Sequence, residues 1–156
     1  MANRTKTLKE LVSLDYDAIE AYDAAIERLE TAAFAERLRQ FRQDHVRHTE
    51  NLGSILRKLN EEVPQGPDMK RMLTEGKVVI AGLGGDKAVL RAMQANEKVT
   101  NKAYEKALEA NGMDAATRET LTRNLEDERR HKAWIDKTIE ELKGGAKSET
   151  KSGARA

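Results

Sequence analysis

The most informative absence from this chain of 156 residues is cysteine, which does not occur at all. Without cysteine the protein can form no disulfide, no iron–sulfur cluster and no thiolate zinc site, and it has no thiol nucleophile. Aromatic residues are scarce, at 4% of the chain, and only 2 prolines are present. A composition rich instead in Ala, Glu, Lys, Leu and Arg is typical of helical proteins and disfavours a β-sandwich or barrel.

Long hydrophobic runs and an excess of one charge are also missing. The longest apolar stretch is Val78–Leu83, far short of the roughly 20 residues that span a bilayer. The first residues, MANRTKTLKEL, contain no apolar signal region. The formal net charge is +1, so the overall field attracts neither nucleic acid nor a membrane surface. We therefore expect a soluble cytoplasmic protein with one domain.

Four segments carry apolar residues at helical spacing: Thr7–Glu30, Ala33–Leu59, Asp86–Leu108 and Asp114–Leu142. Thr7 and Glu10 have the spacing of a capping box. Asp86 and Asp114 are the candidate N-caps of the third and fourth segments. Few residues separate the first segment from the second, or the third from the fourth, so each pair predicts an antiparallel hairpin. The sequence therefore predicts an all-α four-helix bundle over residues 1–142.

The link between the second and third segments is long and contains both prolines (Asn60–Gly85). It is long enough to return along the bundle, so the second and third helices should run parallel. Six apolar residues in it have the spacing of a short amphipathic helix over the core: Met69, Met72, Leu73, Val79, Ile80 and Leu83. Residues 143–156 are of low complexity, with four Lys or Arg and one Glu, and predict a disordered basic tail. A solubilising role for this tail is favoured over contact with nucleic acid.

Polar residues interrupt each apolar stripe near the middle of its helix. They are Asp15 in the first helix, His45 and His48 in the second, Glu97 in the third, and Glu128 and His131 in the fourth. Packing the helices together would bring three carboxylates and all three histidines to one level of an apolar bundle. Because a buried carboxylate is costly unless it is paired or binds a metal, we interpret the cluster as a metal site. A metal-free network of ion pairs is the alternative.

The two halves of the chain repeat this pattern. Asp15 precedes His48 by 33 residues, and Glu97 precedes His131 by 34. The second helix of each half carries a related sequence, DHVRH in one and DERRH in the other. Residues three apart lie on one helix face, so each half presents one acid and one i, i+3 pair. Glu-x-x-His is the spacing of di-iron bundles, and the repeat predicts two hairpins related by a pseudo-twofold axis through the polar cluster.

With these motifs the chain resembles the ferritin-like superfamily, in particular the rubrerythrin-type di-metal carboxylate proteins. It is most similar to a group of small bacterial ferritin-like proteins of unknown function. The resemblance covers Leu8–Leu142 and rests on LDYDAIEAYDAAIERL, FRQDHVRHTENL, residues 76–108 and LEDERRHKAWID. It implies a dinuclear iron or manganese centre. By position, the resemblance implies terminal carboxylates at Asp15 and Glu97, a bridging carboxylate at Glu128, and terminal imidazoles at His48 and His131.

Two positions depart from the superfamily pattern. Asp15 stands where glutamate is usual, which shortens the reach of the carboxylate by one methylene group. His45 stands where a second bridging glutamate is expected, and one imidazole nitrogen binds one metal, whereas a carboxylate can bind two. These departures leave open an atypical dinuclear centre or a site with one metal. Oxygen and imidazole ligands suit Fe, Mn or Zn, and the sequence does not choose among them.

Several neighbours of the cluster have more than one interpretation. Tyr22 and Tyr104, two turns from the acids, fit core aromatics with satisfied hydroxyls better than redox-active side chains. Asp44 and Asp127, beside the histidines, either hold imidazole N–H groups or form exposed ion pairs. Trp134 lies off the apolar stripe, either as a contact in a homodimer or as a partly exposed side chain.

Three functions fit the sequence. The first is a redox metalloprotein whose iron or manganese centre reacts with O2 or peroxide, in oxidative-stress defence or iron handling. Its reductant would come from outside, because a chain without cysteine has no rubredoxin-like module. The second is a non-catalytic interaction module, a helical bundle stabilised by its metal. The third is a metal-free scaffold with a buried ion-pair cluster.

Overall fold

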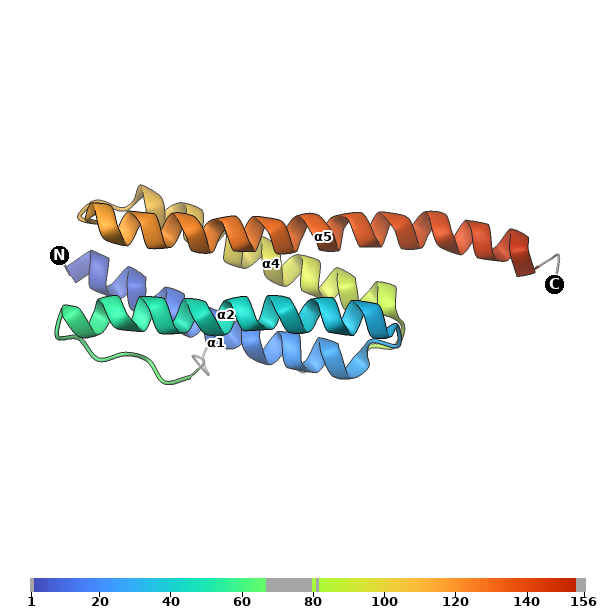
Figure 1. Ribbon diagram of the computed structural model, residues 1–156, viewed down its shortest axis with the longest axis horizontal. Coiled ribbons are helices and arrows are strands. Elements are labelled where there is room, and N and C mark those ends of the chain that lie inside the picture. The colour runs from blue at the N-terminus through green and yellow to red at the C-terminus, as the bar shows by residue number, and fades with distance from the viewer. Residues whose placement is uncertain (1, 67–79, 81, 154–156) are drawn as a thin grey trace.

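A computed structural model describes residues 2–66, 80 and 82–153, and the side chains of residues 4–66, 80 and 82–144. These described residues form four helices and no strand. The helices are α1 (Ala2–Arg28), α2 (Ala32–Lys58), α4 (Asp86–Glu109) and α5 (Ala115–Gly153). Helices α1 and α2 form one antiparallel hairpin and α4 and α5 form the other (Figure 1). The predicted all-α four-helix bundle is confirmed.

The two hairpins pack against each other along their length. Helix α1 contacts α2 and α4, and α5 contacts α4 and α2, so α1 lies diagonally opposite α5. Helices α2 and α4 run in the same direction, as the long crossover predicts, and α1 and α5 run in the other (Figure 1). Every pair of adjacent helices is therefore antiparallel. At its C-terminal end, helix α5 extends beyond its neighbours (Figure 1).

The first helix begins earlier than the sequence predicts. Helix α1 starts at Ala2, so Thr7 lies inside it and the predicted capping box with Glu10 is wrong. No proline or glycine precedes Thr7, so nothing interrupts the helix on that side. The guanidinium of Arg4 also donates a hydrogen bond to the carbonyl oxygen of Gly112 at 3.3 Å, which ties the extra turn to the loop between α4 and α5.

Only one of the two predicted aspartate caps exists. Asp86 is the first residue of α4 and does not cap it. Its carboxylate instead accepts hydrogen bonds from the backbone N–H groups of Glu30 at 2.7 Å and Thr31 at 3.1 Å, because the loop between α1 and α2 lies beside the start of α4. Asp114 caps α5 as predicted, since its carboxylate accepts a hydrogen bond from the Thr117 N–H at 2.7 Å.

Two sequence predictions concern the crossover and the C-terminal segment, and the first falls mainly on residues that are not described. Most of the predicted crossover helix lies in 67–79 and 81, outside the described residues, although Ile80 is buried and Leu83 packs on the same core cluster. The guanidinium Nε of Arg28 donates to the Leu83 carbonyl oxygen at 2.7 Å, which holds the end of the crossover against the end of α1. The backbone of most of the predicted tail, 143–156, continues helix α5 as far as Gly153, and residues 154–156 lie outside the description.

Apolar clusters fill the bundle on both sides of its middle. One is built around the large side chains Tyr22, Leu38, Phe41, Leu90, Met93 and Ile135, and the other around Leu8, Leu52, Leu56, Tyr104, Leu121 and Leu125. Trp134 packs at the edge of the first cluster, with ring centroids 5.8 Å from Phe34 and 5.6 Å from Phe41. Its partly buried position is thus explained within one chain, and a homodimer stays a prediction. Among the described helices, none is long and apolar enough to cross a membrane.

Candidate metal centre

The six residues predicted as metal ligands meet at the middle of the bundle. Asp15 comes from α1, His45 and His48 from α2, Glu97 from α4, and Glu128 and His131 from α5, and each is at most 1% exposed. Their ligand atoms form two groups, each with all its atoms within 4.8 Å of one another: Asp15, His45, His48 and Glu128, and His45, Glu97, Glu128 and His131. Both groups contain His45 and Glu128. The arrangement could hold a metal ion in either group.

Glu128 offers a different carboxylate oxygen to each group. Its Oε1 lies 3.4 Å from Nδ1 of both His45 and His48. Its Oε2 lies 3.7 Å from Nδ1 of His131 and accepts a hydrogen bond from the Thr100 hydroxyl at 3.0 Å. A carboxylate that joins two metal positions must direct one oxygen toward each of them, as Glu128 does.

His45 lies between the two acids that come from α1 and α4. Its Nδ1 is 2.7 Å from Asp15 Oδ1, and its Nε2 is 3.4 Å from Glu97 Oε1. Both ring nitrogens therefore face the cluster. The rings of His48 and His131 lie on either side, with centroids 5.5 and 5.2 Å from that of His45.

The other two histidines are held by aspartates from the opposite hairpin. Nε2 of His48 lies 2.9 Å from Asp127 Oδ2, and Nε2 of His131 lies 2.8 Å from Asp44 Oδ2. Because a carboxylate can only accept, Nε2 carries the proton in both contacts. Each histidine then directs Nδ1 toward the cluster, which is the arrangement that fixes the tautomer of a metal-binding imidazole.

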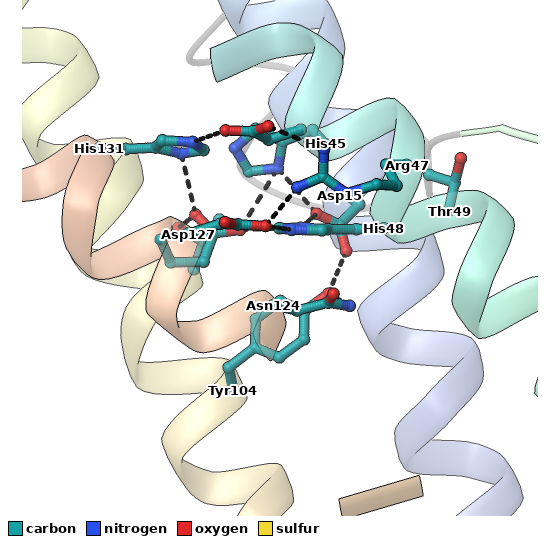
Figure 2. A network of polar contacts seen from close by, with 12 residues as sticks. Asp15, His45, Arg47, His48, Thr49, Tyr104, Asn124, Asp127 and His131 are labelled. Carbon is teal, nitrogen blue, oxygen red and sulfur yellow. Dashed lines mark hydrogen bonds and ion pairs between the residues drawn. The ribbon is translucent and has the colours of Figure 1, made fainter. Parts of the chain in front are cut away.

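The same two aspartates also form ion pairs at the surface. Arg47 lies 2.6 Å from Asp127 and 3.1 Å from Asp44, and Arg130 lies 2.6 Å from Asp127 and 3.1 Å from Asp44. Figure 2 shows Arg47 and His48 reaching the carboxylate of Asp127 together. Burial alone would raise the pKa of Asp127, but hydrogen bonds from His48 and Arg130 outweigh burial and hold it well below its usual range. Both aspartates therefore hold imidazole N–H groups and also pair with exposed arginines, although Asp44 is itself buried.

The two tyrosines link each acid to the opposite hairpin. The Tyr104 hydroxyl donates to Asp15 Oδ2 at 2.5 Å, and the Tyr22 hydroxyl donates to Glu97 Oε1. Burial and the adjacent carboxylates raise both tyrosine pKa values well above 10.0, so both phenols stay protonated. The predicted satisfied hydroxyls are confirmed, but spacing along one helix gave no sign that their partners would be the acids of the other hairpin.

Sequence reasoning missed several polar residues around the cluster. Besides Thr100, the side-chain amide of Asn101 donates to the backbone oxygens of Glu97 at 2.7 Å and Glu128 at 3.2 Å. The amide of Asn124 donates to the Tyr104 hydroxyl at 3.2 Å. A signal was available, because Thr100 and Asn101 follow Glu97 by three and four residues and therefore share its helix face.

Without a metal, the cluster is a network of imidazoles and carboxylates that stabilise each other's charges. Burial acts to lower the histidine pKa values, but the surrounding carboxylates outweigh it and raise His45 and His131 to about 10 and His48 to about 11. Burial would raise the pKa of Glu97, but the adjacent imidazoles of His131 and His45 outweigh burial and lower it. Burial raises the pKa of Glu128.

Two buried atoms at the centre fit a metal better than this network. Within the described part of the chain, Glu128 Oε1 and His131 Nδ1 make no hydrogen bond, and their nearest oppositely charged neighbours lie 3.4 Å away. Buried polar atoms are normally paired, because leaving one unpaired costs about 1–3 kcal/mol. Both atoms belong to groups that coordinate metal ions, and carboxylate oxygen with imidazole nitrogen is a donor set that suits Fe, Mn or Zn. The residues present therefore fit a bound metal.

Comparison with known proteins adds a family but no activity. A family model described as a domain of unknown function, DUF2383, matches residues 3–110. The match includes Asp15, His45, His48 and Glu97 and ends before α5 begins at Ala115. No curated protein and no solved structure matches the chain.

Proposed function

The chain belongs to the DUF2383 family, and from the residues at its centre we propose that it is a ferritin-like protein that binds two iron or manganese ions. The observation that carries this proposal is the pair of four-residue groups that share His45 and Glu128. Glu128 Oε1 and His131 Nδ1, which are buried and make no hydrogen bond among the described residues, support it. Asp15 and His48 would complete one position, and Glu97 and His131 the other.

The charges of the cluster are consistent with two divalent ions. Asp15, Glu97 and Glu128 supply three negative charges when ionised, and the histidines bind metal as neutral imidazoles. Two divalent cations would leave a net charge of +1 in a buried site, whereas an unpaired carboxylate there would be costly. Iron or manganese in these positions would supply one-electron chemistry toward O2 or peroxide.

The burial of the cluster limits the size of any substrate. Each of the six side chains is at most 1% exposed, so a bulky organic molecule would have to displace core residues to reach them. Dioxygen and hydrogen peroxide are small enough to pass between packed helices during local motions. Because the chain has no cysteine, the electrons would come from a separate reductant.

The surrounding residues would hold the ligands in place. Asp127 and Asp44 accept from Nε2 of His48 and His131, which leaves each Nδ1 directed inward. The Thr100 hydroxyl donates to Glu128 Oε2 and fixes the plane of that carboxylate. Such outer contacts normally contribute 10- to 100-fold to metal affinity.

The proposal is tested on protein purified without oxygen and loaded with Fe(II) or Mn(II). We expect about two ions per chain and consumption of peroxide or O2 by the loaded protein. Glu128→Gln should lose both properties, whereas Glu126→Gln, at an exposed position of the same helix, should keep them. Two bound ions without consumption would favour a non-catalytic, metal-stabilised interaction module. A chain that binds neither metal would contradict the proposal.

A further inference from the structure

The ring of His45 is placed unlike those of the other two histidines. His48 and His131 each direct one nitrogen away from the cluster, to Asp127 and Asp44. His45 has no such outer partner among the described residues, and its two nitrogens face acids of different groups. Nδ1 lies 2.7 Å from Asp15 Oδ1 and Nε2 lies 3.4 Å from Glu97 Oε1.

The first group can be assembled from atoms that the second does not use. Around Nδ1 of His45 lie Asp15 Oδ1, at 2.7 Å, and Glu128 Oε1, at 3.4 Å. Nδ1 of His48 is 3.1 Å from the same Asp15 oxygen and 3.4 Å from the same Glu128 oxygen. These four atoms form one compact set.

The second group is built from the remaining atoms of the shared residues. Nε2 of His45 and Nδ1 of His131 each lie 3.4 Å from Glu97 Oε1, and Nδ1 of His131 is 3.7 Å from Glu128 Oε2. Ligand atoms about 2.0–2.2 Å from one ion in a tetrahedral arrangement are about 3.3–3.6 Å apart. The second set therefore already has nearly the spacing of a metal site, and the first is slightly closer where His45 contacts Asp15.

We propose that His45 is itself the second bridge of the centre, with Nδ1 on one metal position and Nε2 on the other. To bind through both nitrogens the ring must release its last N–H proton to solvent when the metals bind, so that His45 is an imidazolate while His48 and His131 stay neutral. This adds a fourth negative charge to those of Asp15, Glu97 and Glu128 and makes the site neutral with two divalent ions. The inference rests on the proposed function, because it needs two bound ions. It explains how a histidine can stand opposite Glu128: each shared residue then supplies one atom to each position. Both positions would have one carboxylate oxygen of their own, one imidazole nitrogen of their own, one oxygen of Glu128 and one nitrogen of His45.

A bridge through the imidazole ring has a measurable consequence for the distance between the ions. The two ring nitrogens are separated by one carbon atom and their lone pairs point away from each other, so ions about 2.0–2.1 Å from each nitrogen would be about 6 Å apart. Two-metal sites joined by carboxylate or solvent oxygens hold their ions about 3.5–4 Å apart. The two arrangements differ by about 2 Å, which X-ray absorption resolves.

The experiment uses the full chain loaded anaerobically with Mn(II), with metal per chain and the metal-edge absorption spectrum as readouts. We expect two ions per chain, scattering from imidazole rings, and no metal–metal contribution between 3 and 4 Å. His45→Glu should retain two ions and gain a metal–metal contribution near 3.5–4 Å. In His45→Asn the amide reaches toward the position of Nδ1, and in His45→Gln toward that of Nε2, so each variant should hold only one ion tightly. Circular dichroism checks that the variants are folded, and the spectrum of the unmodified chain decides the question without them.

The outcomes separate this inference from the function on which it rests. Two ions with a short metal–metal contribution that azide alters would mean an exogenous bridge and overturn the role of His45, while the proposed function would stand. A single ion per chain whose affinity is the same in His45→Gln would also overturn it. A chain that binds no manganese or iron would overturn both.

Discussion

The hairpin of α1 and α2 and the hairpin of α4 and α5 place equivalent side chains around the centre from opposite sides. Their outer residues match: each has a tyrosine on the acid of the other hairpin (Tyr22 and Tyr104). Each also has an aspartate on the histidine of the other hairpin. The arginines beside those aspartates, Arg47 and Arg130, are likewise equivalent.

The inner residues differ. The first hairpin has Asp15, Ala18 and His45 where the second has Glu97, Thr100 and Glu128. The differences are connected, because the Thr100 hydroxyl donates to the Glu128 carboxylate, and Ala18 stands in the half whose shared ligand is an imidazole. The tyrosines, aspartates and arginines that contact the ligands are thus the same in both halves, whereas the residues nearest the shared atoms differ.

Removing Glu128, the only carboxylate that both groups share, should have the largest effect on the stability that the metal contributes. A metal present at 100 times its dissociation constant stabilises the fold by about 2.7 kcal/mol, which is about 5–10 °C in melting temperature for a chain of this size. Chelation should remove this stabilisation from the native protein, and Glu128→Ala should leave little of it to remove. Calorimetry with and without chelator measures both. Identical melting curves, for protein shown to contain metal as purified, would contradict the prediction.

A pH titration of the metal-free protein tests the ion pairs that both hairpins contribute. The pKa values of His45 and His131 rise from 6.5 to about 10, and that of His48 to about 11, so the folded state binds their protons more tightly than the unfolded chain. The stabilisation is complete below pH 6.5 and is lost as the pH rises through about 10. The lowered pKa values of Asp15 and Glu97 act oppositely, since their stabilisation is present above their ordinary range and is lost in acid.

Urea unfolding between pH 4 and 10 should therefore show greatest stability of the metal-free protein in mildly acidic solution. In the presence of metal, stability should instead increase as the pH rises above mildly acidic values, because the metal displaces protons from imidazole and binds better at higher pH. Metal-free stability that increases from pH 7 to 10 would mean that the histidines are neutral in the folded bundle.

The success of sequence reasoning differed between contacts along a helix and contacts across helices. The four helices and the six central residues were predictable, because apolar periodicity and its interruptions are local properties of each segment. The partners of Tyr104 and Asp44 were not, because they depend on how the hairpins are packed. Asp86 failed as a cap for the same reason: a neighbouring loop supplies better-placed N–H groups. Charge of the right kind at the right helical position does not say which helix it faces.

The outer aspartates provide a test of equivalence between the hairpins. Asp127→Asn and Asp44→Asn each replace an acceptor for Nε2 of one histidine and should weaken metal binding by about 10- to 100-fold. Because the two contacts differ by only 0.1 Å, at 2.9 and 2.8 Å, the losses should be similar. Metal titration followed by calorimetry measures them, with Glu50→Gln, at an exposed position of α2, as the control. A loss in one variant only would show that a single position is filled.

The smallest effect on metal affinity is expected at Thr100, where the hairpins differ by a hydroxyl and a methyl group. Thr100→Ala gives the second hairpin the residue that the first has at Ala18 and leaves Glu128 Oε2 without its 3.0 Å donor. One such hydrogen bond contributes about 1 kcal/mol, so metal affinity should fall about fivefold, whereas Thr100→Ser keeps the hydroxyl and should stay close to the native value. The loss should be concentrated in one of the two binding steps, because Oε2 faces His131 and Oε1 faces His48. Equal weakening of both steps in a two-step titration would mean that Thr100 supports the packing of α4 against α5 rather than one oxygen of Glu128.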